Sequence, residues 1–135
     1  ALSLLSTLQT PSPITPFLVF DTTGQFVTIS PQGIAQAFAQ DLSKLEQVQL
    51  TATQGPASVA ALSAMPTVVP AWKTKPAWYI VAGQDKAITA PLEEQMAEKI
   101  NAQTITLPTC HVAMLQEPAK VAEYIEQAAI SAGSR

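Results

Sequence analysis

The sequence is poor in charged residues, cysteine and histidine. Charged side chains make up 13% of the 135 residues, about half the roughly 25% that is usual in soluble domains. The seven basic residues form no cluster and are outnumbered by ten acidic ones, so the chain lacks the positive surface that nucleic-acid binding requires. A single cysteine cannot form an internal disulfide. Nothing therefore indicates an oxidising compartment, and the cytoplasm is the expected location.

Long apolar runs and clusters of metal ligands are missing too. No stretch approaches the roughly 20 consecutive apolar residues that cross a bilayer, and no basic segment precedes the short apolar run at the N-terminus, so no membrane partner is expected. One cysteine and one histidine cannot complete a four-ligand zinc site, and no glycine-rich phosphate loop is present. We therefore expect no metal and no cofactor. What the sequence does have is 47% hydrophobic residues, enough for one packed domain.

Proline and glycine divide the first part of the chain. Residues 1–16 end in three closely spaced prolines, which fix φ and remove amide donors, and so favour an extended connector. Residues 18–20 and 26–29 are mainly apolar and flank Asp-Thr-Thr-Gly at 21–24, a turn-forming segment in which Gly24 tolerates positive φ. This pattern predicts a β-hairpin.

Helices are predicted after the hairpin. A Ser-Pro pair at 30–31 is typical of a helix start, and apolar residues then recur at helical spacing. The pattern predicts a helix over residues 31–42. Residues 43–70 are polar and alanine-rich, which predicts helical pieces interrupted at 55–56 and 65–66, where prolines stand.

The C-terminal half alternates strands and helices. Residues 77–82 form a continuous apolar run bounded by proline and glycine, typical of a strand buried on both faces, and residues 104–107 form a second strand. Pro91 begins an amphipathic helix with Glu93 and Glu94 in its first turn, beside the positive helix end, and Pro118 begins a final helix. The order predicts an α/β fold with two parallel strands in one sheet. The apolar stripe expected on the final helix comprises Val121, Ala122, Ile125, Ala128 and Ala129.

Polar loops follow both predicted strands. Asp85 stands three residues after the first strand, and His111, the only histidine, stands four residues after the second. Catalytic groups collect beyond the carboxyl ends of parallel strands, and neighbouring strands lie roughly 4.8 Å apart. The two side chains can therefore reach each other, with Asp85 fixing the tautomer of His111 while the other ring nitrogen serves a nucleophile. A turn-capping Asp85 and a structural His111 are the alternatives.

These residues resemble a known family. Residues 76–88, Pro-Ala-Trp-Tyr-Ile-Val-Ala-Gly-Gln-Asp-Lys-Ala-Ile, and residues 111–118, which begin His-Val-Ala-Met-Leu and end in Pro, resemble the last two strand-loop-helix units of an α/β-hydrolase. The resemblance implies that Asp85 is the acid and His111 the base of a triad whose chain order is nucleophile, acid, histidine. The implied parts are a connector over 1–16, an insertion over 17–72 similar to the cap of small bacterial members, and a C-terminal strand-helix-strand-helix unit of the hydrolase core over 73–135.

The nucleophile of that family is missing from the sequence. None of the five glycines belongs to a G-x-S-x-G elbow, so the resemblance implies the C-terminal half of an esterase-like serine hydrolase for a small acyl substrate, with its nucleophile on an upstream segment. Two parallel strands leave an edge unpaired, and we expect the upstream half or another copy of the chain to complete the sheet. Cys110 adjoins His111, but adjacent extended residues point apart, so a buried residue is predicted there. A non-catalytic binding module and a lyase of the same fold remain alternatives.

Overall fold

The structure is a computed structural model that describes residues 12–64 and 68–133. Within these residues it contains a three-stranded antiparallel sheet in the N-terminal half and a two-stranded parallel sheet in the C-terminal half. Most of the predicted connector and the predicted break at 65–66 lie outside the described residues. The elements, in chain order, are η1 (Thr15–Phe17), β1 (Leu18–Phe20), β2 (Phe26–Ile29), α2 (Pro31–Gly33), η2 (Ile34–Phe38), α3 (Lys44–Thr53), β3 (Ala57–Ser58), α4 (Val59–Ser63), η3 (Ala71–Lys73), β4 (Trp78–Ala82), α5 (Ala90–Lys99), β5 (Gln103–Leu107), α6 (Ala113–Gln116) and α7 (Pro118–Gly133).

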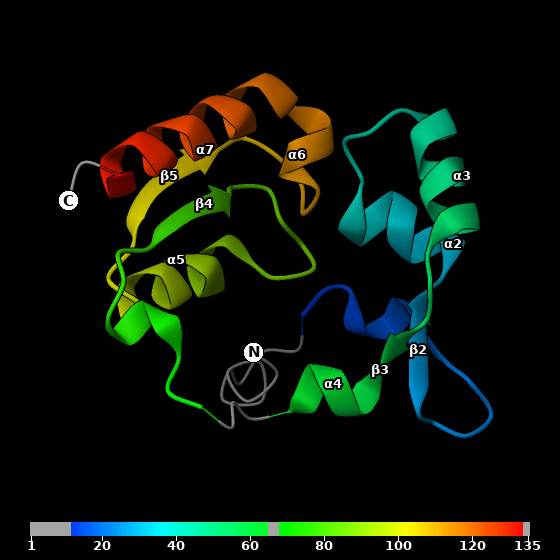
Figure 1. Ribbon diagram of the computed structural model, residues 1–135. Helices are drawn as coiled ribbons and strands as arrows, with labels where there is room; N and C mark the ends of the chain where they lie inside the picture. The colour runs from blue at the N-terminus through cyan, green and yellow to red at the C-terminus, as the bar shows by residue number, and fades with distance from the viewer. Residues whose placement is uncertain (1–11, 65–67, 134–135) are drawn as a thin grey trace.

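β4 and β5 form the parallel pair that was predicted, and α5 and α7 lie on opposite sides of it (Figure 1). The strands pair from Trp78 opposite Gln103 to Ala82 opposite Leu107. Directly after β4, the Gly83 amide donates to the Leu107 carbonyl at 2.8 Å. A Cβ at Gly83 would lie 3.1 Å from that oxygen, so the close approach favours glycine. Both polar loops therefore leave the sheet at the same edge.

The prediction that β4 is buried on both faces is correct only for its end. Val81 and Ala82 are 0% and 4% exposed, whereas the preceding residues 78–80 are half-buried. Among the described strands, β4 pairs with β5 alone, so its second edge has no strand beside it. That open edge leaves the first three residues in contact with solvent.

α7 forms where it was predicted, but its apolar stripe is divided. Val121 and Ala128 are half-buried, and the Tyr124 hydroxyl donates to the Gln103 carbonyl at 2.7 Å, which ties the helix to β5. Ile125 is 60% exposed, because the stripe is wider than the surface that two strands offer. Neither α7 nor any other helix in the described part of the chain is long and apolar enough to cross a bilayer.

β1 and β2 form the predicted hairpin, with Leu18 opposite Ile29. Asp21 closes the turn, since its Oδ1 accepts the Phe26 amide at 3.0 Å. Gly24 has a φ of 69°, a conformation that residues with a Cβ rarely adopt. The short strand β3, which pairs with β2, was not predicted, because two residues carry no periodic pattern. The end of the predicted connector is also not extended, since it enters the 3₁₀ turn η1.

The helix predicted from Pro31 to Leu42 is shorter and of two kinds. α2 provides one α-turn, and the chain then widens into the π-helix η2, where the Ala39 amide donates to the carbonyl five residues earlier at 2.8 Å. After Phe38, the Gln47 side chain donates to the carbonyls of Ala39 and Leu42 at 3.0 and 3.2 Å. These bonds satisfy carbonyls that further helical turns would otherwise use, which ends the helix.

Gln54, directly after α3, binds β2 much as a neighbouring strand would. Its Oε1 accepts the Ile29 amide at 2.9 Å, and its Nε2 donates to the Ile29 carbonyl at 2.8 Å. We expect Gln54→Ala to lower the free energy of unfolding by about 1–3 kcal/mol, because two half-buried backbone groups lose their partners. Urea unfolding measures the loss. Gln49→Ala, on the exposed side of α3, is the control, and an equal loss in both variants would contradict this role.

Candidate active site

Asp85 and His111 lie side by side, as predicted. Asp85 is in the loop after β4 and His111 in the loop after β5, and His111 Nδ1 lies 2.6 Å from Asp85 Oδ2. An ionised carboxylate can only accept a hydrogen bond, so Nδ1 carries a proton. In the neutral imidazole, Nε2 is then the nitrogen left to accept a proton. This is the tautomer that a histidine base requires.

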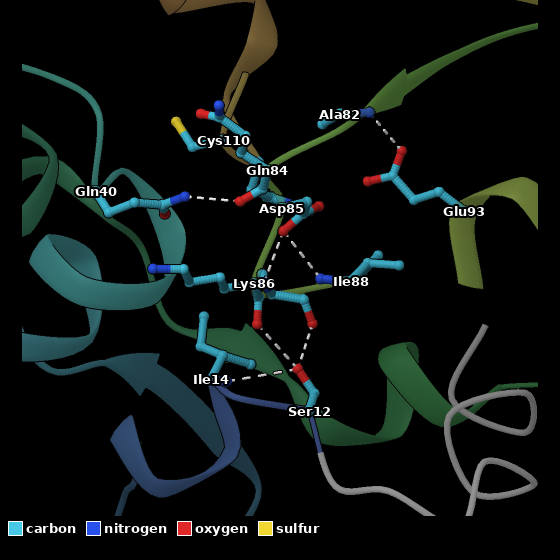
Figure 2. A network of polar contacts seen from close by, with 12 residues as sticks. Ser12, Ile14, Gln40, Ala82, Gln84, Asp85, Lys86, Ile88, Glu93 and Cys110 are labelled. Atoms are coloured by element: carbon cyan, nitrogen blue, oxygen red, sulfur yellow. Dashed lines mark hydrogen bonds and ion pairs between the residues drawn. The ribbon is translucent and has the colours of Figure 1, made fainter. Parts of the chain in front are cut away.

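Backbone amides hold the other oxygen of Asp85. The amides of Ala87 and Ile88 donate to Oδ1 at 2.6 and 3.1 Å, and the contact with Ile88 is drawn in Figure 2. One oxygen thus closes the turn while the other contacts His111, so Asp85 both caps its loop and pairs with the imidazole. The Ser12 hydroxyl donates to the Ala87 carbonyl at 2.6 Å and fixes the same loop from the N-terminal side.

The N-terminal half of the chain covers part of this site. Gln40 Nε2 donates to the Gln84 carbonyl, next to Asp85, at 2.8 Å (Figure 2). The Phe38 ring, carried by the π-helix, lies with its centroid 4.8 Å from that of the His111 ring. The His111 side chain is 30% exposed, whereas that of Asp85 is 0% exposed. The imidazole is therefore anchored through Nδ1 and packed against Phe38, and part of it stays accessible.

Glu93 joins this pair and was not among the predicted site residues. It lies in the first turn of α5, yet it is only 5% exposed. Its Oε2 accepts the Ala82 amide at 2.9 Å (Figure 2), and one of its carboxyl oxygens lies within 4.8 Å of a carboxyl oxygen of Asp85. In the sequence, the one signal was an acid in the first turn of the helix after the Asp85 loop. The contact itself depends on how α5 packs against β4.

Burial and charge set the protonation of three groups. Burial raises the pKa of Glu93 to about 8, and the hydrogen bond with Asp85 and the negative charge of Asp85 add to this. Burial also acts to raise the pKa of Asp85, but the hydrogen bonds from His111 and Glu93 help to hold that pKa below its ordinary value. Burial and the charges of Glu93 and Asp85 raise the pKa of Tyr79 to about 12. At neutral pH, Asp85 is thus ionised while Glu93 and Tyr79 keep their protons.

Asp85, Glu93 and His111 are also residue types that bind metal ions. One ligand atom of each lies within 4.8 Å of the others. These groups already have protein partners, because Asp85 accepts from His111 and two amides and Glu93 accepts from Ala82. A cation would have to displace these contacts. A hydrogen-bonded cluster therefore accounts for the arrangement.

The described chain places no nucleophile beside His111. Within residues 12–64 and 68–133, no serine or cysteine side chain hydrogen-bonds to the imidazole. Cys110 is fully buried in a cluster with Ile34, Ala39 and Val112, as predicted for a small buried residue. The described residues thus hold an acid–histidine pair and not a complete triad.

One hollow is lined by His111, and a second is lined by Phe38, which contacts His111. The first, of about 360 Å³, is lined by Tyr79 and Ile80 of β4, by Met114 of α6 and by His111. The other, of about 480 Å³, lies in the N-terminal half, is mainly apolar, and includes Phe38 in its lining. Because Phe38 also contacts His111, the second hollow lies close to the imidazole.

Comparisons with known proteins agree with this fold. The sequence profile of the alpha/beta hydrolase family matches residues 3–124, whereas no curated protein matches the chain. Among solved structures, the crystal structure of polyneuridine aldehyde esterase is similar, with a TM-score of 0.75 and 19% sequence identity, over 90% of this chain and 52% of that one. The chain thus spans about half the length of that structure, and the likeness is one of fold. By the match to residues 3–124, which covers most of the sequence, the chain belongs to the alpha/beta hydrolase family.

Proposed function

We propose that this chain is the C-terminal part of a serine hydrolase that cleaves small ester-like substrates, with Asp85 as the acid and His111 as the base. The observation that carries the proposal is the 2.6 Å contact between Asp85 Oδ2 and His111 Nδ1, at the edge where both parallel strands end. In α/β-hydrolases the acid and histidine follow the nucleophile in this chain order. The esterase named among the similar structures favours ester hydrolysis over the lyase alternative.

The proposed reaction uses the two nitrogens of His111 differently. Nε2 takes the proton of the serine hydroxyl as the serine oxygen attacks the ester carbonyl, and returns it to the leaving alcohol when the tetrahedral intermediate collapses. Water then attacks the acyl-enzyme, with Nε2 again taking a proton and returning it to serine. Asp85 keeps the proton on Nδ1 and stabilises the imidazolium in both halves of the reaction.

The proposed partner is an upstream segment that brings the serine and the oxyanion donors. The second edge of β4 supports this position, because an open strand edge favours pairing with another strand and residues 78–80 are only half-buried there. The hollow of about 360 Å³ is lined both by β4 and by His111, so a segment that pairs with the open side of β4 lies close to the imidazole. A second copy of this chain is the alternative partner, and it brings no G-x-S-x-G motif.

Residues 17–72 are proposed to act as the cap that shapes the substrate pocket. The apolar hollow of about 480 Å³ in this part of the chain suits a small apolar acyl or alcohol group. Phe38 lines this hollow, and its ring also contacts that of His111. It would therefore contact the substrate close to the scissile bond.

Expression with the protein segment encoded directly before Ala1 tests the proposal. We expect that segment to contain a G-x-S-x-G motif, and the combined protein to hydrolyse p-nitrophenyl butyrate and to lose activity on labelling with a fluorophosphonate. The control is the same protein with alanine at the motif serine, which is expected to be inactive and unlabelled. A combined protein that binds substrate analogues without turnover would instead favour the non-catalytic module.

A further inference from the structure

We propose that Glu93 is a positioning residue for the Asp85–His111 pair: a protonated carboxylic acid that donates a hydrogen bond to Asp85 and is itself held by the amide of Ala82. The effect of Glu93 on catalysis rests on the proposed function. The effect of Glu93 on the geometry of the Asp85–His111 pair is independent of that function and can be measured in the 135-residue chain.

The position of the proton follows from the contacts. Glu93 and Asp85 are 5% and 6% exposed, and two ionised carboxylates cannot share so small and dry a site at low cost. Asp85 has the stronger support for its charge, since its oxygens accept from His111 Nδ1 at 2.6 Å and from the amides of Ala87 and Ile88. Glu93 accepts from one amide only. The shared proton therefore resides on Glu93.

In the described part of the chain, no lysine or arginine forms an ion pair that would neutralise a second carboxylate beside Asp85. The titratable groups that face Glu93 are Asp85 and His111 from the two loops and Tyr79 from β4. Among the ion pairs of the described residues, none joins a lysine or arginine to Glu93 or Asp85. Burial raises the pKa of Tyr79 to about 12, so its hydroxyl stays neutral. The proton on Glu93 is thus what keeps a second negative charge out of the cluster.

Loss of that proton has a direct structural consequence. Burial raises the pKa of Glu93 to about 8, and above that pH two carboxylates face each other without a bridging hydrogen. Repulsion then drives the Asp85 carboxylate from the position in which it holds Nδ1. In Glu93→Gln, an amide nitrogen can donate to Asp85 and the amide oxygen can accept from Ala82 at every pH, whereas Glu93→Leu keeps a similar volume and loses both bonds.

Proton NMR of the 135-residue chain tests the geometry. The single histidine gives one low-field Nδ1–H resonance for its bond to Asp85. We expect the wild type to show this resonance at neutral pH and to lose it as the pH passes the Glu93 pKa of about 8, whereas Glu93→Gln retains it. Glu94→Gln, at the exposed neighbour on α5, is expected to behave as the wild type. A wild type that keeps the resonance as far into alkaline pH as Glu93→Gln does would overturn the proposal.

Kinetics of the combined protein test the positioning role. We expect Glu93→Leu to lower kcat about 10- to 100-fold, the rate equivalent of one hydrogen bond to a charged group, with KM unchanged. Glu93→Gln is expected to have a kcat close to that of the wild type. We expect the kcat of the wild type to decline above pH 8, and that of Glu93→Gln not to. If Glu93 acted only by packing, the kcat values of Glu93→Gln and Glu93→Leu would not differ in this way. If no variant or wild type hydrolyses esters while the NMR results hold, the proposed function fails and the positioning of the pair stands. If the wild type is active and its kcat has the same pH profile as that of Glu93→Gln, the role of Glu93 is overturned and the proposed hydrolase function stands.

Discussion

His111→Ala in the combined protein is expected to lower kcat about 10⁴-fold or more, with little change in KM. The imidazole is placed to move a proton where both strands end, since its Nδ1 is held by Asp85 at 2.6 Å and its ring is partly accessible. Removing it leaves the serine hydroxyl without a base and the leaving alcohol without an acid. Steady-state hydrolysis of p-nitrophenyl butyrate measures the effect.

The size of this loss separates a catalytic role from a structural one. His111 packs against Phe38, so the variant must also be shown to fold, by circular dichroism and by its unfolding midpoint. Thr104→Ala, at an exposed position of β5, is the matched control and is expected to keep wild-type kcat. A folded His111→Ala protein that retained a tenth or more of its activity would rule out His111 as the base.

The pairing of Asp85 with His111, 26 residues apart, could be predicted because it follows from the order of strands and helices. Two apolar runs separated by a helical pattern form a parallel strand pair, and both loops then leave the same edge whatever the details of packing. The alternation of strands and helices after residue 76 therefore placed the acid beside the histidine. The resemblance to α/β-hydrolases added the roles proposed for the two residues, and the fold it implied is the fold observed.

Glu93 and the end of the helix after Pro31 could not be predicted, for a different reason. Both depend on how one element packs against another, and no pattern within a single element shows this. Glu93 has the composition of an ordinary acid at a helix start, and only the packing of α5 against β4 buries it against Ala82 and Asp85. The helix ends after Phe38 because Gln47, from the following helix, bonds the carbonyls beyond it. No periodicity within residues 31–42 indicates such a partner.

The stability of the chain is expected to fall as the pH rises from about 5 to 8, and Glu93→Gln is expected to abolish most of this fall. The pKa of Glu93 rises from 4.5 to about 8 on folding, so between these values the folded chain holds a proton that the unfolded chain has released. Stability decreases with pH wherever the folded state binds more protons, here by about 1.4 kcal/mol per pH unit. Below pH 4.5 Glu93 is protonated in both the folded and the unfolded chain, and its contribution to stability is fully present. Above a pH of about 8 Glu93 is ionised in both states, and this contribution is lost.

Asp85 has the opposite sign and a separate window. Its pKa is lowered on folding, so it contributes stability above its ordinary value of 3.8, and this is lost only as the pH falls below that value. The decline between pH 5 and 8 therefore reports on Glu93. Urea unfolding of the wild type, Glu93→Gln and Glu94→Gln at unit steps of pH measures it, and the exposed Glu94 variant is expected to follow the wild type. Parallel curves for the wild type and Glu93→Gln would show that Glu93 is already ionised at pH 5, and the carboxyl–carboxylate bond would then have no proton to form it.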